Sequence, residues 1–303
     1  MSLHSGLNQN AQQTGRYLPI DHGLNIMNTF TLKIAACLLM VIDHTALFFP
    51  HAIELPMHWI GRLAAPLFTF LCVQACEHTH SIFRYIMRLY TASVGMAFME
   101  LILNRTGNAF TPLFHVALII GILSLRKPPH RVAGLAAYCL WQITLYLLFT
   151  AAEPSISELD ILPRLLVEIV APTALGMGIS IDGGYAYVIL GLIMWVCRKS
   201  RYRLAIWFTV FCGAIFILFN YAPLTNSILP GLAQEYLGLP VSIHWMPFTY
   251  NYQWMMIGAL PFMLLYNGQR GRPVKWLFYW FYPVHLTVIT ILMHLLGAQF
   301  YGA

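Results

Sequence analysis

Long apolar runs separated by short polar segments dominate the chain after residue 31. A helix that crosses a membrane needs about 20 mostly apolar residues, and many of these runs approach that length. Gly, Pro and aromatic residues interrupt the runs and no short apolar–polar alternation prevails, so the pattern predicts helices rather than a β-barrel. The candidate spans are 34–50, 58–77, 84–103, 112–126, 132–152, 164–181, 184–198, 203–221, 249–266 and 276–297.

The composition agrees with a membrane protein. The 303 residues are 59% hydrophobic and 9% charged, with a mean hydropathy of +0.66, whereas a soluble domain is about 25% charged. The net charge of +6 comes from basic residues in short loops between apolar runs. Such loop charges set the orientation of membrane helices, so we expect membrane lipid and no nucleic acid as a partner.

The positions of the basic clusters predict the topology. They comprise Arg84 with Arg88, "RKPPHR" (126–131), "RKSRYR" (198–203) and "NGQRGRPVK" (267–275). All of them fall on the cytoplasmic side only if 164–181 does not cross the membrane. That segment contains Arg164, Glu168 and Pro172, so we expect a re-entrant or interfacial helix there.

The fold class is therefore all-α: a polytopic transmembrane helical bundle with about nine spans plus one re-entrant or interfacial helix. We expect residues 1–31 to form a polar cytoplasmic N-terminal arm and 32–303 a single transmembrane domain in a bacterial inner membrane. "HAIELPMH" (51–58), which lacks Lys and Arg, is expected to be an outer loop, as is 222–248.

Asp43 and His44 are ionisable residues inside the first apolar run, where charge is costly and usually functional or paired. Neighbours in a helix point about 100° apart, so we expect the two side chains to act separately. We expect Asp43 to pair with Arg62 on the next span, and His44 to face a polar cavity. The alternative is a purely structural pair, with His44 as an interior hydrogen-bonding group.

Further histidines occur in "EHTH" (77–80) and "FYPVHL" (281–286). His78 and His80 would point to different faces of a helix and no third ligand is evident, so we expect no metal. His285 lies near the middle of the last span and could be a core histidine or part of a site.

Several motifs occur in an order that resembles one family. They are "LKIAACLLMVIDHTALFF", "WIGRLAAPLFTFLCVQACEHTH", "RYIMRL", "GNAFTPLFHVAL", "DGGYAYVILGLIMWV", "LLYNGQRG" and "FYWFYPVHL". Together they resemble the TraX family, multi-pass inner-membrane proteins of conjugative plasmids. The resemblance covers roughly residues 32–290, and the two first blocks and the last are its most specific parts. The matching residues are Asp43, His44, Gly61, Arg62, Pro66, His78, Arg88 and His285.

The family is associated with acetylation of the N-terminal amine of processed F-type pilin. The resemblance therefore implies an acetyl-CoA-dependent N-acetyltransferase, with acetyl-CoA as donor and pilin or another amine or hydroxyl compound as acceptor. We expect His44 to be the base, Asp43 and Arg62 a supporting pair, and His285 a rival base or a donor to the thioester carbonyl. We expect the anionic end of acetyl-CoA to be bound by His78, Arg84, Arg88, Arg270, Arg272 and Lys275.

Other functions stay open at this point. The acceptor could be a sugar or small molecule, and transfer could be direct or pass through an acetyl-histidine. Intramembrane Asp, His and Glu residues also occur in proton-coupled transporters, although no internal repeat is evident. A structural subunit of a secretion apparatus is a third possibility.

Overall fold

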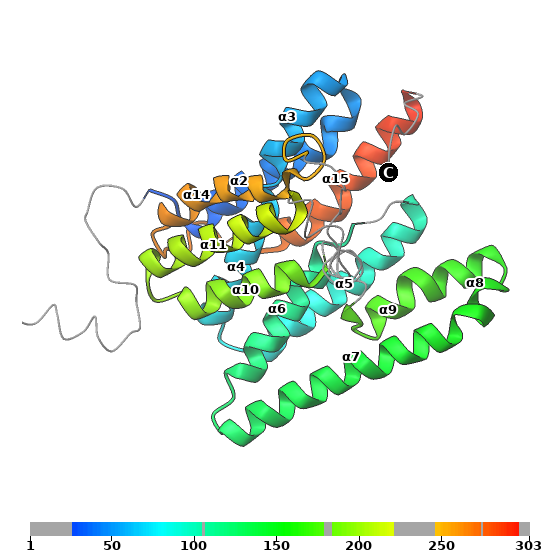
Figure 1. The fold of residues 1–303 in the computed structure, drawn as a ribbon. Helices are drawn as coiled ribbons and strands as arrows, with labels where there is room; N and C mark the ends of the chain where they lie inside the picture. The colour runs from blue at the N-terminus through cyan, green and yellow to red at the C-terminus, as the bar shows by residue number, and fades with distance from the viewer. Residues whose placement is uncertain (1–25, 105–106, 179–183, 221–245, 274, 297–303) are drawn as a thin grey trace, which may run out of the picture.

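The computed structural model describes residues 26–104, 107–178, 184–220, 246–273 and 275–296 (Figure 1). This part of the chain is helical, apart from loops and one isolated bridge between Met27 and Tyr266. The helices are α2 (Thr29–Thr45), η1 (Ala46–Phe48), α3 (His51–Gly61), α4 (Ala64–His78), α5 (Ile82–Leu103), α6 (Phe110–Leu123), α7 (Pro128–Ser157), α8 (Ile161–Leu165), η2 (Leu166–Val170), α9 (Ala171–Ala174), α10 (Gly184–Cys197), α11 (Arg201–Asn220), η4 (Tyr252–Ala259), α14 (Leu260–Leu264) and α15 (Lys275–Leu295). The predicted helical membrane bundle is confirmed.

Six stretches among the described residues are long and apolar enough to cross a membrane. They are Thr29–Phe48, His51–His78, Ile82–Leu103, Pro128–Ser157, Arg201–Leu218 and Phe278–Leu295. Two shorter apolar helices are Phe110–Leu123 and Gly184–Cys197.

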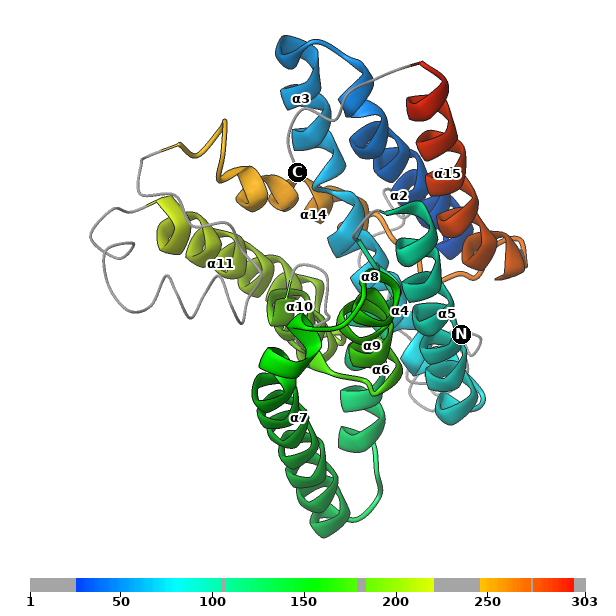
Figure 2. The same ribbon diagram turned by 90° about the vertical axis from the view of Figure 1, so that its right-hand side faces the viewer.

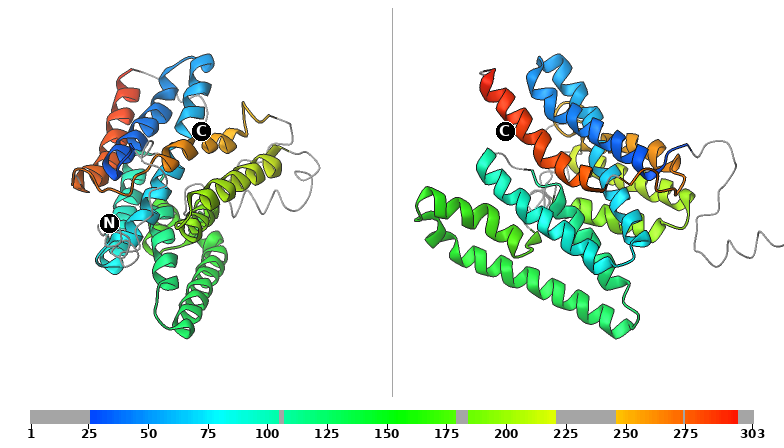
Figure 3. Two further views of the ribbon diagram at one scale, coloured as in Figure 1. Left: turned by 90° about the vertical axis from the view of Figure 1, so that its left-hand side faces the viewer. Right: turned by 180° about the vertical axis from the view of Figure 1, so that it is seen from behind.

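Helix α4 is the centre of the bundle. Most of its side chains are buried, and it packs against α2, α6 and α10. Helix α7 lies at the edge, beyond α6 (Figure 3), and Leu145 is its one fully buried residue. Its exposed apolar face is what lipid contact requires, because apolar side chains in a membrane need no protein cover.

Contacts between distant segments define one end of the bundle, which we call the basic end. Arg198 forms an ion pair with Glu77 at 2.9 Å, joining the end of α10 to the end of α4. Arg201 donates to the carbonyl of Tyr266 at 2.7 Å, and Tyr266 forms the bridge to Met27. Three of the chain's turns therefore lie together with the start of α2.

The segment after α7 turns back along α7, and its first helix, α8, has no buried residue. The consecutive helices α8, η2 and α9 cover Ile161–Ala174, roughly 21 Å at 1.5 Å per residue, which is shorter than a bilayer core. They run beside α7 (Figure 1), where Gln142 donates to the carbonyl of Gly176 and accepts from the N–H of Gly178. The predicted re-entrant or interfacial helix at 164–181 stays a prediction. The end of the predicted segment, 179–181, lies outside the described residues.

Three predictions about helix boundaries are wrong. The predicted outer loop 51–58 is helix α3, because Pro50 precedes the first turn and the one interior proline, Pro56, is tolerated despite its missing N–H. The run 249–266 is not one α-helix but a 3₁₀ stretch, η4, followed by the short α14. The first span begins at Thr29, capped by the Asn28 side chain, so the predicted arm ends earlier than residue 31.

Candidate active site

Helix α2 directs Asp43 and His44 to different neighbouring helices. It lies between α3 and α15 (Figure 2) and packs against both. Asp43 contacts His58 of α3, whereas His44 contacts His285 of α15. The expectation that the two residues act separately is met in geometry, because residues one apart on a helix face different directions.

His44 and His285 form a direct hydrogen bond. Nδ1 of His44 lies 2.9 Å from Nε2 of His285. The rings are within 4° of parallel and their centroids are 5.1 Å apart. The centroid distance is close to the nitrogen separation plus the two ring radii, so the rings lie nearly in one plane with the bond along the line between them. Sequence reasoning placed both residues in the site but treated them as rivals.

The hydrogen bonds of His285 determine which nitrogens of the neutral pair carry protons. Nδ1 of His285 lies 2.8 Å from the carbonyl oxygen of Phe281. A carbonyl can only accept, so this Nδ1 carries a proton and Nε2 of neutral His285 is an acceptor. Nδ1 of His44 must then donate to it, which leaves the proton-accepting lone pair of His44 on its Nε2.

His44 lies in the last turn of α2, directly before η1. His285 is almost fully buried, with 8% of its surface exposed, and Phe281 stacks on its ring with centroids 4.9 Å apart. The pair is therefore held by packing as well as by hydrogen bonds.

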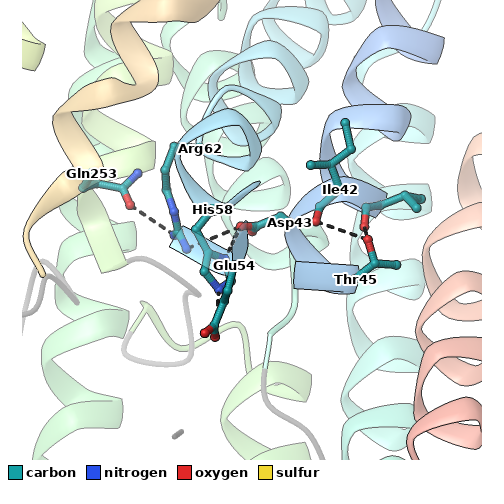
Figure 4. Close-up of polar contacts among 8 residues, drawn as sticks. Ile42, Asp43, Thr45, Glu54, His58, Arg62 and Gln253 are labelled. Carbon is teal, nitrogen blue, oxygen red and sulfur yellow. Dashed lines mark hydrogen bonds and ion pairs between the residues drawn. The ribbon is translucent and has the colours of Figure 1, made fainter. Parts of the chain in front are cut away.

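Asp43 has a closer partner than the one predicted for it. Its Oδ1 lies 2.8 Å from Nδ1 of His58 and 3.7 Å from a terminal nitrogen of Arg62 (Figure 4). The expected pairing with Arg62 exists but is the longer contact. A carboxylate that faces both an imidazole and a guanidinium is well compensated for leaving water.

Arg62 is held by contacts from two elements, α2 and η4. It lies at the break between α3 and α4, donates to Gln253 at 3.3 Å and lies 5.2 Å from the ring of Tyr252. Gln253 in turn donates to the hydroxyl of Tyr187 on α10 at 2.7 Å. These contacts link η4 to the Asp43 side of the site. With 8 residues, η4 is unusually long for a 3₁₀ helix.

Gly61 allows Asp43 to approach α3. A Cβ at residue 61 would overlap the Asp43 side chain, at separations well under 3.0 Å. The match of Gly61 to the family motif thus has a steric reason in this chain, since only glycine leaves room for the carboxylate.

The residues expected to bind the donor lie at the basic end but are not assembled into one site. His78, Arg84, Arg270 and Arg272 are exposed. Arg88 is partly buried, lies 5.8 Å from the Tyr85 ring and interacts with the Tyr279 hydroxyl. The side chain of Lys275 lies outside the described residues. In the part of the chain that the structure describes, these cations do not converge on one shared partner, so their role stays a prediction.

Sequence reasoning missed three residues near the site, Glu54, His58 and Gln253. Glu54 and His58 precede the predicted Arg62 at intervals of four residues, which places all three on one face of α3, and this spacing was a readable signal. Gln253 carried no signal, because the geometry of η4 decides its direction.

The family model for TraX protein matches residues 28–293, from the cap of α2 to the last turns of α15. The chain belongs to the TraX family. No curated protein and no solved structure matches it. The TraX match spans both histidines, Asp43, His58 and Arg62, so the site described above lies wholly within the family's shared region. The resemblance read from the motifs is confirmed.

Proposed function

We propose that this TraX-family membrane protein is an acyltransferase that moves an acetyl group from acetyl-CoA to an amine. The observation that carries the proposal is the His44–His285 pair, whose hydrogen bonds leave a proton-accepting nitrogen on His44. Neutral histidine is suited to general base catalysis near pH 7. The Phe281 carbonyl supports His285 in the same way that a third group orients the base in other acyl-transfer sites.

The chemistry needs one proton to move from nitrogen to sulfur. The amine attacks the thioester carbonyl, a C–N bond forms and the C–S bond breaks. Nε2 of His44 accepts the proton that the nitrogen loses, and its own Nδ1 proton can pass to Nε2 of His285 across the 2.9 Å bond. The reverse transfer returns a proton to the departing thiolate of CoA. His44 is thus the base and His285 its positioning and relay partner.

Arg62 is the candidate for stabilising the oxyanion that develops on the thioester carbonyl. Its guanidinium is already positioned by Asp43, Gln253 and the Tyr252 ring. Preorganised cations act best when they need not move as charge develops.

The donor would bind from the basic end. The exposed Arg84, Arg270 and Arg272 and the partly buried Arg88 offer cations for the phosphates of CoA. The thioester end of acetyl-CoA would reach the histidines along α15, past Tyr279 and Tyr282. The ring of Tyr282 lies 5.4 Å from that of His285. We place this end in the cytoplasm, where acetyl-CoA is made.

The acceptor we propose is the N-terminal amine of a processed pilin, in line with the association of the TraX family. Mass spectrometry of pilin from cells with and without this protein tests it. We expect a difference of one acetyl group. An unchanged pilin mass at normal expression would refute this acceptor and leave a sugar or small-molecule acceptor for the same chemistry.

A proton-coupled transporter is the second candidate, because Asp43 and His58 form an intramembrane acid–imidazole contact of the kind proton relays use. Uptake into proteoliposomes driven by a pH gradient, in the absence of any acyl donor, would favour it over the transferase.

A further inference from the structure

Acidic and imidazole side chains alternate along α3 and end at Asp43. Nδ1 of His51 lies 3.3 Å from Oε2 of Glu54, Oε1 of Glu54 lies 3.7 Å from Nε2 of His58, and Nδ1 of His58 lies 2.8 Å from Oδ1 of Asp43. Each imidazole presents a nitrogen to the carboxylate next to it. We call these four side chains the acid–imidazole ladder (Figure 4 shows its inner three members).

The ladder leads from the surface into the bundle. The His51 side chain is 80% exposed, whereas those of Glu54, His58 and Asp43 are 24%, 19% and 20% exposed. His51 is the first residue of α3, next to the turn that joins it to α2. This turn is at the end of α2 opposite Thr29 and hence away from the basic end.

The groups around the ladder supply charge but do not interrupt it. Arg62 faces Asp43 from the end of α3. From η4, the Tyr252 ring stacks near His58 at 6.3 Å between centroids. On α2, His44 interacts electrostatically with Asp43, but its hydrogen bond is to His285. Asp43 and Glu54 are thus the carboxylates, and His58 is the bridging imidazole.

Acetylation of an amine produces a net proton. The balanced reaction is R–NH₃⁺ + CH₃CO–S–CoA → R–NH–COCH₃ + HS–CoA + H⁺. The amine loses two protons, and only one of them is returned to sulfur. The histidine pair of the proposed mechanism accounts for that one. The other must leave the membrane interior, where a stranded charge is costly.

We propose that the acid–imidazole ladder carries this net proton to the surface at the α2–α3 turn. Asp43 takes it from the bound ammonium and, once protonated, donates to Nδ1 of His58. In its Nε2–H tautomer, His58 receives the proton on Nδ1 and releases the Nε2 proton to Glu54, and His51 delivers it to water. Tautomer exchange of neutral His58 then resets the ladder. Rotation of the Glu54 carboxylate closes the 3.7 Å step to His58. The inference rests on the proposed acetyl transfer, and it gives the neighbours Asp43 and His44 different protons to handle.

Glu54→Gln tests the ladder, because glutamine keeps the size and hydrogen bonding but cannot carry a proton. We expect about a tenfold slower acetyl transfer by the full-length protein in lipid nanodiscs at low buffer concentration, at the modest end of general acid–base effects. The KM for acetyl-CoA should not change. Added imidazole or concentrated buffer should restore the rate, since a small base can replace the interrupted step.

Glu153→Gln, an exposed carboxylate replacement on α7, is the matched control and should behave as wild type. A Glu54→Gln rate equal to wild type, or a loss that neither imidazole nor buffer restores, would overturn the ladder. A merely structural role for Glu54 gives the second result.

A measurement without substrate separates this inference from the proposed function. In ¹⁵N NMR of histidine-labelled protein, His51→Ala should shift the titration of His58, and Glu54→Gln should abolish that shift. Coupled titration in a protein that transfers no acetyl group would refute the transferase and uphold a proton path. Independent titration of the two histidines would overturn the path whatever the activity.

Discussion

Replacing Gly61 by alanine should move Asp43 and destabilise the protein, although alanine normally favours a helix. The added Cβ would overlap the Cβ, Cγ and Oδ1 atoms of Asp43. Either the carboxylate leaves His58, to which it is bonded at 2.8 Å, or α2 and α3 separate. The last residue of α3 offers no other direction for the new methyl group.

The magnitude follows from two opposing effects. Alanine in place of a helical glycine gains about 0.5–1 kcal/mol, and inserting a methyl group into a packed contact costs about 1–3 kcal/mol. The net expectation is a loss of about 0–2.5 kcal/mol, toward the upper end because the new Cβ would overlap three atoms of Asp43. Gly95→Ala on α5 is the control, because no atom outside its own helix backbone lies within 4 Å of a Cβ there, and it should be neutral or stabilising by up to about 1 kcal/mol.

Thermal unfolding of the three purified proteins in the same detergent measures the difference. We expect a lower midpoint for Gly61→Ala than for wild type, and an equal or higher midpoint for Gly95→Ala. If Gly61→Ala unfolds at or above the wild-type midpoint, the close approach of Asp43 to α3 is not a feature of the folded protein, and the Asp43–His58 contact loses its support.

Further predictions concern single steps of the proposed reaction. His285→Phe removes the acceptor of the His44 Nδ1 proton and should lower kcat by about 10²–10⁴-fold, the range of general acid–base catalysis. His285→Gln keeps an acceptor oxygen and should retain more activity. Equal losses of kcat in the two variants would contradict the positioning role of His285. Arg88→Ala should weaken acetyl-CoA binding by roughly tenfold or more, as expected for a lost charge-assisted contact. Arg203→Ala, at the same end of the bundle, should not weaken it. Isothermal titration calorimetry measures both affinities, and equal affinities of wild type and Arg88→Ala would remove Arg88 from the donor site. Gln253→Leu should reduce kcat more than acetyl-CoA affinity because it frees the Arg62 guanidinium from η4, and an unchanged kcat in a steady-state assay would exclude Arg62 positioning by this contact.

The sequence predicted the helices better than it predicted their ends. Apolar length identifies a membrane helix whatever lies beside it, so α2, α5 and α15 begin within a few residues of their expected positions. Hydropathy alone predicts a loop at the polar "HAIELPMH". Its Glu54–His58–Arg62 spacing is helical, and α2 supplies the carboxylate partner that makes polar residues tolerable there.

The partners of site residues depend on how helices rotate about their axes, which composition does not reveal. Helix geometry alone separated Asp43 from His44. The approach of His285 to His44 needs the packing of α15 on α2, two elements at opposite ends of the chain. The hydrogen bond from Arg62 to Gln253 depends on the 3₁₀ geometry of η4, which no periodicity in 249–266 indicates.

The most direct test of the central claim is acetyl transfer by a His44→Ala variant. Full-length wild type and variant in nanodiscs are given acetyl-CoA and processed pilin, with donor binding measured separately and the product followed by mass spectrometry. The account predicts that both proteins bind acetyl-CoA with similar affinity, that wild type adds one acetyl group to the pilin amine, and that His44→Ala adds it at least about 10²-fold more slowly. Transfer by His44→Ala at the wild-type rate would contradict the assignment of His44 as the base.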